Sequence, residues 1–360
     1  MVYGIYWAAQ SVITACLNLA ASYEVAALGW RWYYWVFAIT VAVGLILAIF
    51  LGFETSYQRS SQFVNGRLVI TDQFGVTRML TEYETREYLD THGHPGDEHH
   101  IPEELRPKKT YLQMLIPWSS PRESPLTLVP RTTLQIFEAF MSPGILYATL
   151  VASVVLGSSI GMSLSYNTVL QYNYNWAPRS IGLINLGGVF GGFGGMLYAG
   201  FFGDKFIIWM AKRNGGVHTP EHRLPLLIFP GILGVVALLL YGFTAGGSAT
   251  WGGPYMGWTL FQITFVSVLI LSTSFAAEAW EKNPGPAIVA VVGVKNIVAF
   301  ALSYGINPMT EKYDYPVAMG ILAAICGGVF LLGIPVYFLN PKVWYIYSFC
   351  LNRMEEADYS

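Results

Sequence analysis

Charged side chains are scarce in this sequence of 360 residues. Asp, Glu, Lys and Arg make up 12% of the chain, and 54% of the residues are hydrophobic, whereas soluble domains carry about 25% charged residues. A soluble globular protein is therefore excluded as a class, because most of the surface must face lipid. The net charge of -2, with basic residues that do not gather on one helical face, also argues against a nucleic-acid partner.

Several chemical motifs are missing as well. Three cysteines cannot form a disulfide framework, so we expect no disulfide. The absence of a P-loop pattern argues against an ATP-driven machine and leaves an ion gradient as the energy source. Residues 157–161 (GSSIG) match G-x-S-x-G, but they lie in an apolar run and all six histidines lie outside such runs, which excludes a serine hydrolase. We expect no cofactor.

A cluster of histidines in a polar segment is the remaining candidate for a metal site. Its spacing matches no closed zinc pattern, and a solvated low-complexity segment is the favoured interpretation, so we expect no metal ion. The clustered histidines are His92, His94, His99 and His100.

Long apolar stretches dominate the rest of the chain. Each approaches or exceeds the roughly 20 residues that a helix needs to cross the hydrocarbon core. The predicted spans are residues 2–23, 32–53, 144–168, 181–202, 224–243, 255–277, 287–306 and 316–339. The predicted fold class is therefore an all-α, multi-pass membrane protein with eight transmembrane helices.

The polar segments indicate sidedness and domain organisation. Sixteen of the 20 Lys and Arg residues lie on one side of the predicted spans, and three lie on the other. By the positive-inside rule both termini and the long insert are cytoplasmic. Within the insert, residues 65–80 alternate in polarity and predict a small hairpin, residues 91–107 are expected to be disordered, and residues 112–118 and 126–140 look amphipathic enough to lie at the membrane surface.

Four stretches carry a family resemblance. They are residues 29–35 (GWRWYYW), 52–57 (GFETSY), 211–224 (AKRNGGVHTPEHRL) and 294–304 (VKNIVAFALSY). In this order they resemble fungal major facilitator superfamily transporters of the twelve-span drug:proton antiporter type, most of all the histidinol and polyamine permease-like branch. The chain would correspond to helices 5 to 12 of that fold, with helices 1 to 4 absent.

This resemblance implies a partial major facilitator fold with four parts. Residues 1–53 would be the last two helices of the N-terminal bundle, 54–143 a cytoplasmic central loop, 144–340 the C-terminal six-helix bundle, and 341–360 a cytoplasmic tail. The implied protein is a monomer in the plasma membrane, surrounded by lipid.

The implied function is secondary transport by alternating access. The cargo would be a small organic solute such as a drug, a polyamine or a similar cation, moved with protons. The glycine-proline signature of antiporters is absent from residues 2–23, so antiport, symport and uniport all remain open. A membrane sensor or receptor that does not transport, and an inactive truncated fragment, are the alternative functions.

A gating motif is expected at the cytoplasmic end of the fourth span. Gly200, Asp204 and Lys205 fit the superfamily pattern G-x-x-x-D-[RK], and Arg213 lies beyond them. An Asp just past a helix end can pair with a basic group or a helix N-terminus in one of two transporter states. The alternative is an ordinary helix cap with positive-inside charges. Glycines repeating at every fourth residue from Gly187 predict a smooth packing face, which the resemblance implies would meet the first span.

Polar side chains recur on single faces of three other spans. Such stripes turn toward protein or water and not toward lipid, so they either line a substrate cavity or bond neighbouring helices. The resemblance favours the cavity. The candidate cavity residues are Asn167, Gln171, Trp258, Gln262, Lys295, Asn296 and Tyr304.

Lys295 is unusual because it lies about eight residues into its span, roughly 12 Å below the cytoplasmic boundary. We expect it to face the cavity or an acidic partner, with snorkelling to the interface as the alternative. A lysine in the cavity would oppose a cationic substrate unless an acidic group neutralised it.

Overall fold

A computed structural model of the chain describes residues 2–51, 62–64, 67–71, 77–79, 125–216, 219–247, 250–279 and 284–340. The chain divides into two compact units. One unit is Met1–Tyr33 together with Leu126–Ser360, and the other is Tyr34–Pro125.

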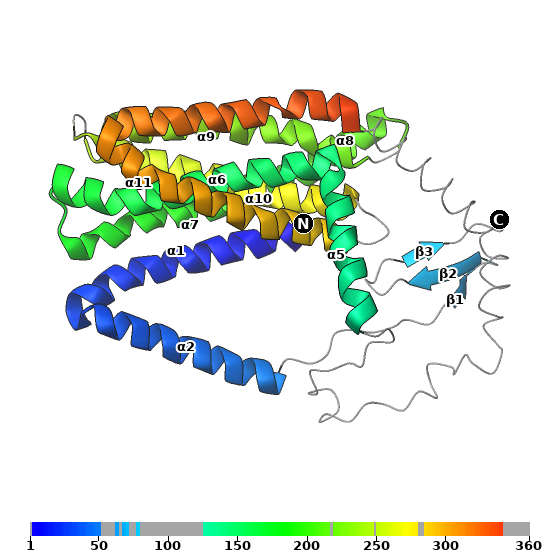
Figure 1. Cartoon of the computed structure of the whole chain (residues 1–360), viewed down its shortest axis with the longest axis horizontal. Helices are drawn as coiled ribbons and strands as arrows, with labels where there is room; N and C mark the ends of the chain where they lie inside the picture. Colours follow the sequence, from blue (N-terminus) through cyan, green and yellow to red (C-terminus); the bar gives the residue numbers. More distant parts are fainter. Residues whose placement is uncertain are drawn as a thin grey trace. The chain divides into compact units, whose positions relative to one another are not determined.

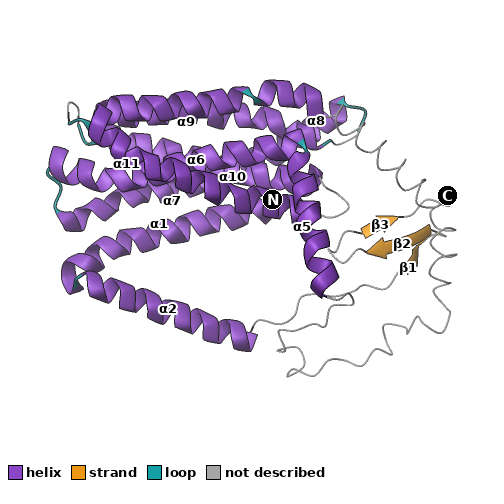
Figure 2. Cartoon of the chain, in the orientation of Figure 1, coloured by secondary structure: helices purple, strands orange, loops and turns teal. Residues whose placement is uncertain are grey.

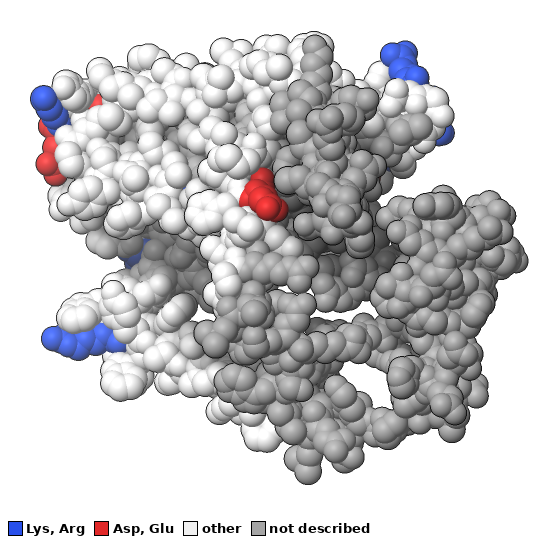
Figure 3. Space-filling view, turned by 45° about the vertical axis from the view of Figure 1, so that its right-hand side comes forward, with Lys and Arg blue, Asp and Glu red and all other residues white. Residues whose placement is uncertain are grey.

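The described residues include eight helices that are long and apolar enough to cross a membrane, which confirms the predicted fold class. The described residues visible in Figure 3 are largely uncharged, as expected for a surface in contact with lipid. Helical segments account for almost all of the described chain (Figures 1 and 2). The α-helices are α1 (Val2–Leu28), α2 (Trp30–Leu51), α5 (Pro125–Met141), α6 (Pro143–Thr168), α7 (Leu186–Gly195), α8 (Gly203–Arg213), α9 (Ile228–Ala245), α10 (Gly252–Ala279) and α11 (Pro284–Leu331).

Shorter helical segments join these helices. They are the 3-10 helices Pro178–Asn185 and Pro220–Leu227 and the π-helical segments Val169–Asn173 and Met196–Phe202. α11 covers the predicted span 287–306 and most of the span 316–339, and between them Asp314 breaks the helical geometry with φ 62° and ψ 168°.

α6 and α10 form the centre of the larger unit. Most residues of both helices are buried, polar side chains such as Ser159 and Gln262 among them. Their neighbours supply the rest of the core, in which Tyr241, Phe261 and Phe275 are fully enclosed. α6 packs against α11 and α10, and α10 also packs against α9 and α7.

The helix of the fourth predicted span does not end at Phe202, where a helix end was expected. The helix continues from Met196–Phe202 directly into α8, because Gly203 has ordinary helical angles (φ -58°, ψ -49°) and no proline interrupts the segment. It ends only at Asn214, where Gly215 and Gly216 adopt positive φ values of 69° and 87°. Asp204 therefore lies within a long helix and not in a loop.

The glycines of α7 form two packing faces where one was expected. A Cβ at Gly191 would lie 2.3 Å from Cβ of Gln262, so the predicted face packs against α10 and not against the first span. The neighbouring face contacts α1, since a Cβ at Gly188 would lie 3.0 Å from Cβ of Ala15. α7 does meet the first span, as the resemblance implied, but through different glycines.

The smaller unit contains a three-stranded antiparallel sheet. Its strands are β1 (Gln62–Val64), β2 (Arg67–Thr71) and β3 (Thr77–Met79), in the order β1-β2-β3 (Figure 2). The hairpin expected in residues 65–80 is therefore confirmed as β2 and β3. The predicted disorder of residues 91–107, the surface segment 112–118 and the clustered histidines lie outside the described residues.

The second predicted surface segment is confirmed as a helix, α5. Figure 1 shows α5 running across the direction of the bundle helices. Its position at the membrane surface stays a prediction.

Candidate functional site

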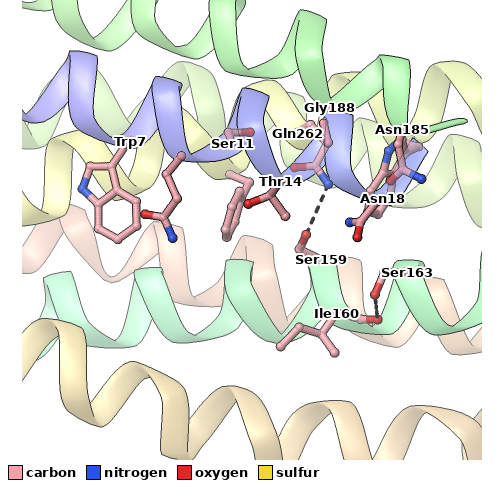
Figure 4. Close-up of a pocket in the computed structure, with 14 residues that line it drawn as sticks. Trp7, Ser11, Thr14, Asn18, Ser159, Ile160, Ser163, Asn185, Gly188 and Gln262 are labelled. Carbon is pink, nitrogen blue, oxygen red and sulfur yellow. Dashed lines mark hydrogen bonds between the residues drawn. The ribbon is translucent and has the colours of Figure 1, made fainter. Parts of the chain in front are cut away.

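A cavity of about 250 Å³ lies among α1, α6, α10 and the start of α7. Its long direction follows α1, and Figure 4 shows Trp7 at one end and Asn18 with Asn185 at the other. Residues 7 and 18 are separated by about 16 Å along a helix. The lining residues are Trp7, Gln10, Ser11, Thr14, Ala15, Asn18, Ser159, Ile160, Ser163, Asn185, Gly188, Trp258, Gln262 and Phe265.

The lining of this cavity is polar but uncharged. Four carboxamides and four hydroxyl groups face it, together with three aromatic rings, and none of the fourteen lining residues is acidic or basic. A lining of this kind can donate and accept hydrogen bonds and can also cover an apolar group.

Several of these polar groups make hydrogen bonds that are either long or directed to a backbone carbonyl of their own helical segment. Gln262 Nε2 donates to Ser159 Oγ across the cavity at 3.4 Å (Figure 4). Asn185 Nδ2 donates to Gly182 O at 3.2 Å. The indole N–H of Trp258 is buried and has no hydrogen-bond partner among the described residues. The cavity wall therefore keeps hydrogen-bonding capacity that it does not use itself.

Three helices meet at the Trp7 end of the cavity. Trp7 Nε1, on α1, donates to Thr273 Oγ1 of α10 at 3.0 Å. Lys295 Nζ, on α11, lies 4.4 Å from the centroid of the Trp7 ring. Lys295 is only 5% exposed, so the ring covers a buried cation. This contact, which we call the Trp7 junction, lies at one end of the cavity.

The structure brings together only part of the predicted cavity set. Trp258 and Gln262 line the cavity, and Lys295 reaches its wall through Trp7. The remaining four predicted residues are exposed and lie outside the lining, and they are Asn167, Gln171, Asn296 and Tyr304.

The cavity residues of α1 were missed by the sequence prediction. Gln10, Thr14 and Asn18 recur at every fourth position in an otherwise apolar span. That spacing places them on one helix face, and a polar face within a membrane span turns toward protein or water. This signal was sufficient to identify them.

The predicted gating residues do not line the cavity. Gly200 lies close to α1, since its nearest neighbours include the Cα atom of Gly4. Lys205 Nζ lies 4.1 Å from the ring centroid of Phe201, and the Arg213 guanidinium lies 4.2 Å from that of Trp209. Both cations therefore stack on rings of their own helix. Their role in gating stays a prediction.

A polar cluster that the sequence analysis did not identify ties helix ends together. Arg223 forms a bidentate pair with Glu278, in which Nε donates to Oε2 at 2.6 Å. Asn340 donates to Glu221 Oε1 at 2.8 Å and accepts from the backbone N–H of Gly144 at 3.0 Å. These contacts join the beginning of α6, the approach to α9 and the ends of α10 and the last span.

The sequence profile of the Major Facilitator Superfamily matches residues 1–300. Among similar proteins, an uncharacterized MFS-type transporter, C1271.10c, of Schizosaccharomyces pombe is 25% identical over 98% of this chain and 65% of its own length. The MFS-type transporter tndD of Aspergillus flavipes is 25% identical over 94% of this chain and 55% of its own. The efflux pump radE of Floropilus chiversii is 23% identical over 88% of this chain and 52% of its own.

The chain thus spans between about half and two thirds of the length of these relatives. The profile match covers most of the chain, and the eight candidate spans agree with it. The chain therefore belongs to the Major Facilitator Superfamily and is a multi-pass membrane protein.

Proposed function

We propose that this chain forms part of a secondary transporter that moves a small organic solute by alternating access. The observation that carries the proposal is the uncharged polar cavity between α1 and the helices α6, α7 and α10. Transporters bind their cargo near the bilayer midplane, between two structural repeats that rock against each other.

The proposed domain assignment places the cavity at such a boundary. Residues 1–53 would belong to the N-terminal bundle, 54–143 to a cytoplasmic loop, 144–340 to the C-terminal bundle, and 341–360 to a cytoplasmic tail. α1 then contributes one wall, and the C-terminal bundle contributes the others. Rocking would separate α1 from α10 and α11 at the Trp7 junction. At the cytoplasmic side, the superfamily gating residues, Asp204 among them, would change their partners between the two transporter states.

The type of cargo and its energy source are further proposals. The drug or polyamine class rests on the resemblance alone, because none of the described lining residues supplies an acidic group for a cation. Proton coupling needs a group that can exchange a proton near the site, and Lys295, beside the cavity wall, is our candidate.

We further propose that the protein is monomeric and lies in the plasma membrane with both termini in the cytoplasm. The bias of Lys and Arg among the segments between spans supports this orientation. Protease digestion of N-terminal and C-terminal tags in sealed vesicles would test this orientation. If a protease added to the cytoplasmic side fails to cleave either tag, the orientation is rejected.

The test of transport separates a transporter from a sensor. Proteoliposomes containing the protein are supplied with radiolabelled 3-phenylpropanoate, spermidine or a neutral phenyl amide, with and without a proton gradient. Accumulation of one probe that a protonophore reduces supports proton-coupled transport. Saturable binding without accumulation supports the sensor alternative.

A matched pair of variants assigns this flux to the cavity. Thr14 lines the cavity, whereas its neighbour Ile13 is 59% exposed and does not. Thr14→Trp should fill the cavity and abolish both flux and binding, and Ile13→Trp should leave both unchanged. Equal flux in the two variants would reject the cavity as the transport site.

A further inference from the structure

We propose that the cavity recognises an organic anion, a carboxylate attached to an apolar or aromatic body, with Lys295 as its counter-charge. This inference rests on the proposed function, because it assigns a substrate class to the same cavity. It differs from the cationic class that the resemblance implies.

The first support is the environment of Lys295. The residue is 5% exposed within a predicted span, and among the described residues it makes no ion pair and lies on the Trp7 ring. The buried Arg223 pairs with Glu278, whereas the other described cations that lie on aromatic rings, Lys312 among them, are exposed. A buried cation without an anion is costly in a membrane, so a site that retains one is suited to receive an anion.

The second support is independent of Lys295. The indole N–H of Trp258 is buried, lines the cavity region and has no acceptor among the described residues. An indole N–H and an ammonium group can only donate hydrogen bonds. A polyamine also offers only donors in its charged form and satisfies neither group. A carboxylate beside Lys295 can accept from the ammonium, and Trp258, toward the Asn185 end of the cavity, can donate to a further acceptor on the ligand.

The third support is the composition of the wall. The rings of Trp7, Trp258 and Phe265 face the cavity beside the carboxamides, and no acidic side chain is among the lining residues. Rings provide contact area for an apolar body, and carboxamides bond its other polar groups. The wall lacks the carboxylates with which proteins usually bind an organic cation.

Trp7 gives Lys295 a route to such a ligand. Its ring contacts the ammonium group, and the same residue lines the cavity. The cation–π contact stabilises the ammonium while the cavity is empty. When the bond between Trp7 and Thr273 opens, the ring can turn and leave Lys295 facing the bound carboxylate.

The test compares three probes that share one phenylpropyl body. The full chain in lipid nanodiscs is titrated with 3-phenylpropanoate, 3-phenylpropanamide and 3-phenylpropylamine, and dissociation constants are measured by calorimetry. We expect the carboxylate to bind at least roughly tenfold more tightly than the amine. Lys295→Met should remove the preference for the carboxylate over the amine but should still bind the amide. Lys295→Arg should keep the preference, and the exposed control Lys312→Met should not change it.

Several outcomes would overturn the proposal. Equal or tighter binding of the amine, no binding of the carboxylate, or an unchanged preference in Lys295→Met would each reject the anion assignment. The Thr14→Trp variant distinguishes this failure from failure of the proposed function. If it abolishes binding while the amine is preferred, only the substrate class is wrong; if it leaves all binding unchanged, the cavity itself is not the site.

Discussion

Trp7 connects three helices through one side chain. Its N–H donates to Thr273 Oγ1, its ring covers Lys295, and the residue also lines the cavity. A tryptophan suits this position, because its ring supplies contact area while its indole N–H fixes the orientation of the ring. Small movements of this residue would therefore change both the shape of the cavity and the charge that faces it.

A double-mutant cycle tests the bond at the Trp7 junction. Trp7→Phe and Thr273→Val each remove one partner, and we expect a coupling free energy of about 0.6 kcal/mol, the average for hydrogen bonds within membranes. The measurement is the free energy of unfolding in detergent. The control pairs Trp7→Phe with Thr264→Val, whose hydroxyl bonds Pro230 O instead. Equal coupling free energies in the two cycles would contradict a specific hydrogen bond between Trp7 and Thr273.

At the residue scale, the sequence indicates an unusual environment where chemistry alone decides it, and the part that these residues play in a substrate site stays a prediction. Lys295 was identified because a charge in an apolar span needs a special position, and Trp258 and Gln262 because polar groups avoid lipid. Asn296 and Tyr304 lie one position around the helix from the buried side of α11, and Asn296 Nδ2 bonds the Val292 carbonyl. A polar stripe shows that a face exists, but the rotation of the helix decides which side is enclosed.

At the scale of elements, α7 is a spacer with glycine on two faces. Gly191 lets α10 approach on one side, and Gly188 lets α1 approach on the other. The fourfold spacing predicted a smooth face, but the partner of that face depends on how the helices are arranged. The same limit explains why the helix end was expected too early: polarity changes near Phe202, whereas the hydrogen-bonded helix continues to Arg213.

Gly191→Ala should destabilise the contact between α7 and α10. The added Cβ would lie 2.3 Å from Cβ and 2.9 Å from the backbone carbonyl carbon of Gln262, so a backbone must shift. Overpacking of this kind costs roughly 1–3 kcal/mol. Gly293→Ala is the control, since a Cβ there meets nothing within 4 Å. The measurement is the midpoint temperature of thermal unfolding. An equal decrease in the two variants, or no decrease in either, would count against this packing.

The pair of Arg223 and Glu278 should stabilise the junction between the approach to α9 and the end of α10. Glu278→Gln removes charge-assisted bonds from a partly buried pair and should cost roughly 1–2 kcal/mol of unfolding free energy. Arg223→Lys keeps the charge but loses the bidentate geometry, so its cost should be intermediate. Identical stability of the three proteins would show that the pair contributes nothing.

For the whole molecule, the sequence was sufficient to predict the membrane class and the eight spans. Apolar length is a local property, and it requires no knowledge of helix neighbours. The cavity could be predicted only in part, because its wall joins Gln10 and Asn18 of α1 with Ser159 and Gln262 of distant helices. Which of several polar faces converge is a property of the packed bundle.

Alternating access predicts that the two ends of the cavity open to opposite sides of the membrane. Ser11 lies toward the Trp7 end, and Asn18 lies at the other end (Figure 4). With the native cysteines replaced by serine, Ser11→Cys should react with a membrane-impermeant thiol reagent from the cytoplasmic side. Asn18→Cys should react from the opposite side.

The most direct measurement is the rate of this labelling in right-side-out and inside-out vesicles, with Ile13→Cys as the control that faces away from the cavity. We expect opposite sidedness for the two cavity positions, faster labelling of Ser11→Cys when Trp7→Phe weakens the junction, and no labelling of the control. Labelling of both cavity positions from the same side, or of neither, would contradict a cavity that opens alternately.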